Sequence, residues 1–325
     1  MRVLITGATG FLGGYLVREF ALHGCDVIAF GRNAEIGGQL RDCTFVRGDF
    51  TVYEDISRAA KGADVVVHAG ALCNVWGRWQ DFYDTNVLGT KRVLDACREH
   101  GVPKFVFVSS CSVYSSTHDR INISETDMDA GNHLNFYIKT KIMAEELIQS
   151  YCAKHEISYS IIRPHGIFGV GDTSIMPRLI KANQKIGIPL FCRGQNLIDI
   201  VCVENVAYSL WLCANSEKNG IYNITNGEVY AYRQMVDELF AAMGVKPRYV
   251  PIKFSIAYAL AGVLEGIYKA LRCKSEPIVT RYTLTTIGVS QTLDISRARQ
   301  ELGYQPKLTL REGFAAYAGW WNENH

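Results

Sequence analysis

The 325-residue sequence predicts an α/β protein, with a Rossmann-like doubly wound parallel sheet followed by a smaller C-terminal lobe. Three observations indicate this fold. A short apolar run, Val3 to Ile5, leads into Gly7, Gly10 and Gly13 and then into a segment with helical periodicity. Strand-like and helix-like segments alternate after it, as parallel sheets require. A later run, Val65 to His68, is continuously apolar up to its last residue, as in a strand buried on both faces.

The composition excludes several classes of protein. Hydrophobic residues make up 48% of the chain, which is enough for a large core in one big or two unequal domains. The net charge is only +2, and no run of five like charges occurs, so a nucleic-acid-binding surface is not expected. The ten cysteines form no C-x-x-C pair, and no metal site is expected. The chain starts directly with its first strand and has no signal-peptide pattern, which predicts a cytoplasmic protein.

The glycine turn predicts a dinucleotide cofactor. Its spacing is G-x-x-G-x-x-G, and it lies between a strand and a helix. Glycines there let the backbone approach a pyrophosphate, whose charge is met by free N–H groups at the helix N-terminus. The predicted cofactor-binding residues of the turn are Gly7, Gly10, Phe11, Leu12 and Gly13.

The second strand, Val27 to Phe30, ends in Gly31-Arg32. A site that prefers NAD usually has Asp or Glu near this point to hold the ribose 2′-hydroxyl. Because this chain has a guanidinium instead, Arg32 favours NADP, whose 2′-phosphate it can bind. Arg32 could also be a solvated loop cation, and NAD then remains the alternative.

Other predicted strands end in residues suited to a cofactor. Asp49 follows the strand Thr44 to Val46 and could accept a hydrogen bond from adenine or serve only as a turn residue. The small residues Ala69, Gly70 and Ala71 follow the fourth strand and leave room for the cofactor. His68, at the end of that strand, is interpreted as a hydrogen-bonded structural histidine.

The next segment, residues 72–83, is rich in aromatic residues. Packing is the ordinary explanation, but the position after strand four suggests that Trp76 and Trp79 line the mouth of an apolar substrate pocket. Asn86 is predicted to open a helix over Val87 to Glu99.

A helical Tyr-x-x-x-Lys pair is the strongest catalytic signal. Tyr137 and Lys141 lie at i and i+4 of a strongly helix-forming segment and share one face. A nearby ammonium favours the phenolate and moves the pKa of a tyrosine toward neutrality. The serines at 109, 110 and 112 follow the predicted strand Phe105 to Val108. The spacing alone is weak evidence, since Tyr249 and Lys253 repeat it around a helix-breaking proline.

These motifs together resemble the extended short-chain dehydrogenase/reductase superfamily. They comprise the glycine turn, Asp49, Asn86, Ser109 to Tyr114, Tyr137-x-x-x-Lys141 and Arg163 to Gly169. Val75-Trp76-Gly77 ahead of Asp81-Phe82-Tyr83, Glu204 to Ala207 and Ser290 to Asp294 are most similar to the 3β-hydroxysteroid dehydrogenase branch, which includes bacterial reductases of long-chain β-keto acids.

The resemblance implies roles for individual residues. Ser110, rather than Ser112, would bind the substrate oxygen, Tyr137 would be the general acid/base, and Lys141 would bind the nicotinamide ribose. The same resemblance implies cofactor contacts for Asn86, Pro164 and Ile167 and a substrate contact for His165. It also implies a homodimer through the two helices beside strands four and five.

The predicted organisation is a dinucleotide-binding domain over residues 1–165, to which strands around 197–203 return, and a mainly substrate-binding lobe over 166–325. Residues 158–163 and 220–225 are further predicted strands, and 312–321 is a closing helix. The apolar run Phe254 to Leu264 is too short to span a bilayer. Peripheral membrane contact of the region 254–271 is a less favoured alternative.

The sequence therefore predicts an NAD(P)-dependent oxidoreductase that interconverts a secondary alcohol and a ketone on an apolar, steroid-like or β-keto acyl substrate. One alternative is a nucleotide-sugar epimerase or dehydratase with tightly bound cofactor, although residues 196–203 lack the Arg-Asp-aromatic pattern common in such enzymes. The other alternative is a dinucleotide-sensing protein without turnover.

Overall fold

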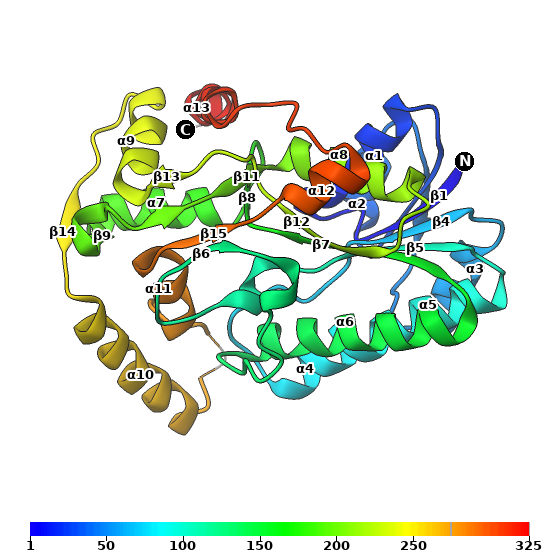
Figure 1. Cartoon of the computed structure of the whole chain (residues 1–325), viewed down its shortest axis with the longest axis horizontal. Helices are drawn as coiled ribbons and strands as arrows, with labels where there is room; N and C mark the ends of the chain where they lie inside the picture. Colours follow the sequence, from blue (N-terminus) through cyan, green and yellow to red (C-terminus); the bar gives the residue numbers. More distant parts are fainter. Residues whose placement is uncertain (274, 325) are drawn as a thin grey trace.

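A seven-stranded parallel sheet forms the centre of the protein (Figure 1). The computed structural model describes residues 1–273 and 275–324. The strands lie in the order β3, β2, β1, β4, β5, β7, β12, and every neighbouring pair is parallel. Their bounds are β1 Arg2–Thr6, β2 Asp26–Gly31, β3 Thr44–Arg47, β4 Val65–His68, β5 Lys104–Val108, β7 Ser158–Pro164 and β12 Gly220–Ile224. The predicted doubly wound sheet is confirmed.

Helices cover both faces of this sheet. One face is packed by α1 and α8, with α12 beside them, and its core includes Leu16, Phe20 and Leu210. The other face is packed by α3, α5 and α6 (Figure 1). The bounds of these helices are α1 Phe11–Leu22, α3 Tyr53–Ala60, α5 Thr90–Glu99, α6 Phe136–His155, α8 Val203–Asn215 and α12 Ser296–Leu302.

The remaining elements include a smaller lobe at the carboxyl ends of the strands. Its helices are α7 Ile175–Lys185, α9 Tyr232–Ala242, α10 Phe254–Ala270, α11 Arg281–Gly288 and α13 Leu310–Asn324. Short strands join it: β6 Arg120–Ile123, β8 Gly166–Phe168, β9 Ile188–Leu190, β10 Leu197–Ile198, β11 Ile200–Cys202, β13 Tyr230–Ala231, β14 Tyr249–Pro251 and β15 Gln291–Leu293. A short helix, α2 Ala34–Gln39, follows β2. Separate clusters of apolar residues, around Phe240 and around Phe191, form the cores of this region.

Residues 197–203 do not join the seven-stranded sheet, and their return to the dinucleotide-binding domain stays a prediction. They form β10, which pairs with β13 and β15, and β11, which pairs with β8. The strand that does return is β12, which lies beside β7. Sequence pattern could not distinguish the two, because both are short apolar runs and only the path of the intervening helix α8 decides which of them reaches the sheet edge.

The prediction that Asn86 opens a helix is wrong. Helical structure begins at α4, Trp79–Tyr83, and continues through a π-helical turn, Asp84–Gly89, into α5. Asn86 lies inside that π-helical turn and is 2% exposed. Turns of this kind widen a helix locally and are frequent at functional sites.

A buried ion pair joins α6 to the sheet. The Arg163 guanidinium on β7 contacts the Glu145 carboxylate on α6 at 2.5 Å, and both side chains are fully buried. The Ser109 hydroxyl also donates to Glu145, and Arg163 donates to the Tyr114 hydroxyl at 2.6 Å. Glu145 lies four residues beyond Lys141 and eight beyond Tyr137, on the same face of the helix. The pair therefore sets how that face meets the end of β5.

We predict that Arg163→Met lowers the free energy of unfolding by about 3–5 kcal/mol, because it leaves the Glu145 carboxylate buried without its charge partner. Urea unfolding followed by tryptophan fluorescence measures the change. The control is Arg78→Met, which removes an arginine from the exposed pair with Asp81 and should have a much smaller effect. Equal losses in the two variants would contradict the assignment.

Candidate active site

The candidate site lies where the strand order reverses, between β1 and β4, at the carboxyl ends of the strands. Gly7 follows β1 with φ of +72°, in the left-handed region that favours glycine. A Cβ at Gly7 would lie 2.7 Å from the Gly70 backbone nitrogen, in the turn after β4. The two turns are thus in close backbone contact. This contact explains why small residues occur at both positions.

The N-terminus of α1 has the features of an anion-binding site. Gly10 is its N-cap, and within the described residues no side chain caps the helix and no acidic residue occurs in its first turn. Phe11, Leu12 and Gly13 open the helix. A Cβ at Gly13 would lie 2.1 Å from the Gly7 carbonyl oxygen, so this glycine holds the helix against the turn. Unpaired N–H groups and the helix dipole favour a phosphate there.

A second hollow lies at the carboxyl ends of β2 and β3. It has a volume of about 370 Å³ and is lined by Arg32, Arg47, Gly48, Asp49 and Asp55. The ion pair from Arg32 to Asp49 is 3.5 Å long, and the Arg32 side chain is 80% exposed, so the guanidinium remains accessible. The other Asp49 oxygen accepts from the Thr51 backbone and hydroxyl. Asp49 thus makes the contacts expected of a turn residue. Its hydrogen bond to adenine stays a prediction.

Tyr137 and Lys141 lie in the first turns of α6, whose N-cap is Asn135. Lys141 is 2% exposed, donates to the Val108 carbonyl at 2.8 Å, and has its ammonium 5.9 Å from the centre of the Tyr137 ring. Burial lowers the pKa of Lys141 to about 8. Burial also raises the pKa of Tyr137 well above its ordinary value, while an interaction with Ser110 opposes the rise.

The protein's own groups therefore do not produce the lowered tyrosine pKa expected from the sequence. Desolvation exceeds every favourable contact of the phenolate, and Tyr137 is held as a neutral phenol. A neutral phenol is a proton donor. The arrangement thus suits delivery of a proton to a ligand oxygen.

Ser110 lies on the turn between β5 and the short helix Cys111–Tyr114, which it caps by accepting from the Ser112 backbone at 3.1 Å. Its hydroxyl is near the Tyr137 phenol, whose pKa it lowers. Ser112 is 2% exposed. The structure thus brings Ser110, Tyr137 and Lys141 together, and their catalytic roles stay predictions.

His68 is the structural histidine that the sequence predicts. It is fully buried, and its two ring nitrogens are hydrogen-bonded to the hydroxyls of Thr6, at 2.6 Å, and Thr90, at 3.1 Å. Burial, with a smaller contribution from Lys141, lowers its pKa to about 3. His68 is thus neutral in the folded protein, whereas it takes up a proton below pH 6.5 in the unfolded chain.

We predict that this histidine makes the protein lose stability on acidification. The His68 contribution is fully present above pH 6.5 and decreases as the pH falls toward 3, because only the unfolded state binds the proton. Denaturation at a series of pH values measures it as the slope of unfolding free energy against pH. That slope is proportional to the number of protons taken up on unfolding. His68→Asn should lower this number by about one between pH 6 and 4. An unchanged slope in a folded variant would contradict the prediction.

Asn86 and the two tryptophans hold the loop after β4. Asn86 accepts from the Leu72 backbone nitrogen at 2.8 Å and donates to the Leu72 carbonyl and the Thr140 hydroxyl. The indole of Trp76 donates to the Cys273 carbonyl at 3.1 Å, joining this loop to the segment after α10. Packing accounts for Trp79, which contacts Phe136 and has the Lys139 ammonium 4.6 Å from its ring centre. Substrate and cofactor contacts of these three residues stay predictions.

The end of β7 supplies the last predicted residues. Pro164 is its final residue, His165 follows it, and Ile167 lies on β8 opposite Val201. His165 is 7% exposed, and its Nδ1 lies 3.4 Å from Asp199 Oδ1. Burial lowers the pKa of His165 to about 4 and raises the pKa of Asp199 to about 7.

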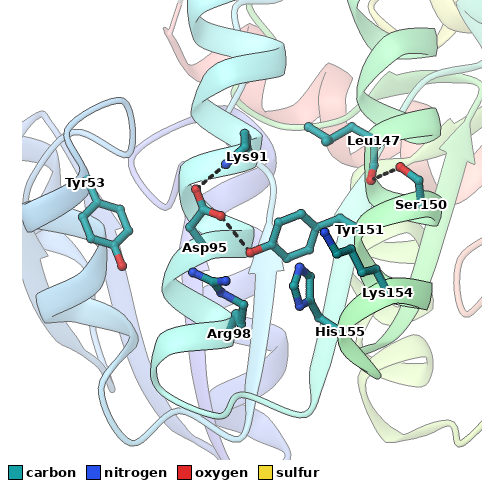
Figure 2. Close-up of a pocket in the computed structure, with 9 residues that line it drawn as sticks. All are labelled: Tyr53, Lys91, Asp95, Arg98, Leu147, Ser150, Tyr151, Lys154 and His155. Carbon is teal, nitrogen blue, oxygen red and sulfur yellow. Dashed lines mark hydrogen bonds and ion pairs between the residues drawn. The ribbon is translucent and has the colours of Figure 1, made fainter.

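A separate groove has a volume of about 630 Å³. Figure 2 shows the side chains that line it. It is lined by residues of α3, α5 and α6, including Lys91, Asp95 and Tyr151, and lies at the opposite end of α6 from Tyr137. Asp95 accepts from Lys91 at 2.8 Å and from Tyr151 at 2.7 Å, so these polar groups pair with one another. The groove lies on the helices that are predicted to form a homodimer interface. The homodimer itself stays a prediction.

Helix α10 has an exposed apolar stripe, made of Ile256, Leu260, Val263 and Ile267, each at least 49% exposed. Over residues 1–273 and 275–324, no helix is long and apolar enough to cross a membrane, and no group of three or more metal-ligating side chains occurs. Peripheral membrane contact through residues 254–271 stays a prediction.

Several residues of the site were missed by sequence reasoning. Arg47 lines the hollow at the end of β3, and Asp199, Tyr282 and Gln291 come to the site from positions distant in the chain. A usable signal existed for Asp199, which is a lone carboxylate within the apolar run Leu197 to Val203. The burial of Tyr282 next to Cys111 and Tyr137 could not be predicted from the sequence pattern.

Comparison with known proteins connects this geometry to a family. A model of the NAD dependent epimerase/dehydratase family matches residues 3–225. The 2-alkyl-3-oxoalkanoate reductase of Stenotrophomonas maltophilia is 30% identical over 323 residues, covering 96% of this chain and 97% of that protein. The reductase of the same name from Shewanella oneidensis is 30% identical, and the match covers 95% of this chain and 83% of that protein. The sterol-4-alpha-carboxylate 3-dehydrogenase, decarboxylating, of Mus musculus is 28% identical, covering 95% of this chain and 87% of that protein.

Solved structures agree on the fold. MoeE5 in complex with UDP-glucuronic acid and NAD is 27% identical with a TM-score of 0.77, and each chain is covered completely. The crystal structure of gox2253 has a TM-score of 0.80 at 24% identity, covering 99% of this chain and 98% of that one.

Proposed function

Since the chain belongs to the NAD dependent epimerase/dehydratase family and is an NAD(P)-dependent oxidoreductase of the extended short-chain dehydrogenase/reductase type, we propose that it interconverts a secondary alcohol and a ketone on an apolar substrate, using NADP(H). The observation that carries the proposal is the meeting of Ser110, Tyr137 and Lys141 at the carboxyl end of β5. A nicotinamide dinucleotide fits the close Gly7–Gly70 contact and the uncapped N-terminus of α1.

In this proposal Tyr137 transfers the proton. The nicotinamide supplies or accepts the hydride when bound. The neutral phenol donates to the ketone oxygen during reduction, and Ser110 donates a second hydrogen bond to the same oxygen. Lys141, held by the Val108 carbonyl, keeps a positive charge beside the phenol and stabilises the phenolate that remains.

The relatives suggest a narrower substrate class. In a 2-alkyl-3-oxoalkanoate, one carbon separates the carboxylate from the ketone, and in a sterol 4-carboxylate oxidised at position 3 the carboxylate is likewise on the neighbouring carbon. We extend this feature to the present chain. Its substrate is a 3-oxo or 3-hydroxy carboxylate with an apolar substituent at position 2.

The preference for NADP rests on two arginines. Arg32 and Arg47 line one hollow at the end of β2 and β3, where the adenosine ribose of a bound dinucleotide lies in such folds. Gly31 and Arg47 are direct partners in the parallel ladder, so the two guanidiniums approach the hollow from neighbouring strands. Together they can bind a 2′-phosphate by charge-assisted hydrogen bonds.

We predict that Tyr137→Phe lowers kcat by about 10²–10⁴-fold, because it removes the proton donor, while NADPH affinity changes little. Stopped-flow or steady-state absorbance of the nicotinamide and a fluorescence titration with NADPH measure the two quantities. Tyr151→Phe makes the same change on the outer end of α6 and serves as the control with normal turnover. Near-normal turnover of Tyr137→Phe would refute the assignment.

We predict that Arg32→Ala weakens NADPH binding by about 10- to 100-fold and NADH binding only slightly, since NADH has no 2′-phosphate. Arg47→Ala should act in the same direction, and the double variant should prefer NADH. Fluorescence titration of each variant with NADPH and with NADH gives the dissociation constants. Arg58→Ala removes a nearby cation that pairs with Asp55 and does not line the hollow, so it should leave the preference intact. Equal losses for both cofactors would refute the 2′-phosphate site.

A nucleotide-sugar epimerase or dehydratase is the second candidate, which the likeness to MoeE5 in complex with UDP-glucuronic acid and NAD favours. In that case the cofactor is reduced and reoxidised within each turnover. Conversion of a UDP-sugar with no net change in nicotinamide absorbance would support it. Net oxidation of NADPH by 2-alkyl-3-oxo acids would support the reductase.

A further inference from the structure

A buried polar cluster lies beside the serine turn. It consists of His165, Asp199 and Gln291, which are 7%, 2% and 6% exposed. The Gln291 amide donates to the Cys111 carbonyl at 3.4 Å, so the cluster contacts the residue that follows Ser110. It comes from three separate parts of the chain: the end of β7, the residue between β10 and β11, and β15. The tertiary structure alone brings them together.

Three atoms of this cluster have unused hydrogen-bonding capacity. Within the described residues, His165 Nδ1, His165 Nε2 and Asp199 Oδ1 make no hydrogen bond, and Nδ1 lies 3.4 Å from Oδ1. The other Asp199 oxygen accepts from the Leu293 backbone at 2.8 Å and is thereby anchored. Buried polar groups are nearly always paired, and leaving one unpaired weakens the folded state. Such a cluster beside a catalytic turn is suited to a ligand.

The protonation of the pair decides which ligand it suits. The low-dielectric surroundings keep the imidazole neutral and favour the protonated form of the carboxyl group, because burial lowers the pKa of His165 and raises that of Asp199. A protonated Asp199 that donates to Nδ1 leaves the proton of the ring on Nε2. The N–H at Nε2 is then a hydrogen-bond donor on the side of the ring away from Asp199. The amide hydrogen of Gln291 that does not bind Cys111 is a second donor. A carboxylate oxygen is the acceptor that best matches such donors.

We propose that His165, oriented by Asp199 and assisted by Gln291, binds the carboxylate of the substrate, on the carbon next to the one that exchanges hydride. This inference rests on the proposed function and adds a residue set that recognises the carboxylate. His165 and Gln291 act as binding residues, and Asp199 is a positioning residue that holds the imidazole tautomer. In the proposed reaction Ser110 and Tyr137 bind the reacting oxygen, and the residue after Ser110, Cys111, accepts from Gln291.

The test compares two substrates that differ only at the carboxylate, a 2-alkyl-3-hydroxyalkanoate and its methyl ester, in NADP⁺-dependent oxidation. The hydroxy acid is used because it does not lose CO₂ as a 3-oxo acid does. The expected result for His165→Leu is a fall of about 10- to 100-fold in the ratio of kcat/KM for the acid to kcat/KM for the ester. The loss should appear mainly in KM. His165→Gln, which keeps an N–H donor, should recover part of the ratio.

The outcomes separate the two proposals. An unchanged ratio in His165→Leu, with normal NADPH binding and thermal unfolding, overturns the carboxylate site and leaves the reductase proposal intact. The same conclusion follows if the cluster binds a buried water in place of the carboxylate. Absence of turnover of both substrates by the unmodified protein overturns the proposed function and the site with it. Where His165→Leu does not fold, Gln291→Leu gives the same ratio test, and an unchanged ratio there overturns the proposal.

Discussion

The buried ion pair between Arg163 and Glu145 is the constraint on which the site depends. It joins the helix that carries Tyr137 and Lys141 to β7, and through Ser109 it reaches the turn that carries Ser110. Two charges inside the core are costly unless each is fully hydrogen-bonded, and here the carboxylate receives the guanidinium and a hydroxyl together. Such a pair tolerates little displacement. It therefore fixes the rotation of α6 about its axis, and with it the face on which the phenol and the ammonium lie.

Desolvation also governs the chemistry of the site. It keeps Tyr137 neutral, lowers the pKa of Lys141 toward neutrality and keeps His68, which is hydrogen-bonded to Thr6 at the end of β1, unprotonated. An apolar interior strengthens each hydrogen bond that a ligand would make there. The same interior accounts for the unusual state of His165 and Asp199, three of whose polar atoms have no hydrogen-bond partner among the described residues. The site is thus prepared for a ligand with an apolar body and a few polar groups in defined places.

The relatives include reductases of oxo acids and sterol carboxylate dehydrogenases, and the solved structures include a protein bound to UDP-glucuronic acid and NAD. One fold thus occurs in proteins with different substrates, because the side chains placed on a fold, and not the fold itself, decide function. In this chain the lobe includes α10, with its exposed aliphatic stripe, and the loop held by Trp76. In our proposal this lobe contributes to substrate specificity, since its short strands β10, β11 and β15 place Asp199 and Gln291.

The sequence by itself determined the sheet, its glycine turn, the helical Tyr137–Lys141 pair and the structural nature of His68, because each depends on local periodicity or on spacing within one element. It misplaced the start of the helix around Asn86, because a π-helical turn leaves no local signature. It also did not decide which of the short apolar runs, 197–203 or 220–225, reaches the edge of the sheet. Only the tertiary structure decided that Arg47 joins Arg32, that burial raises the pKa of Tyr137, and that His165 meets Asp199 and Gln291. The physical reason is common to all three. Burial and long-range contact depend on residues more than ten positions apart, and no pattern within a single segment encodes them.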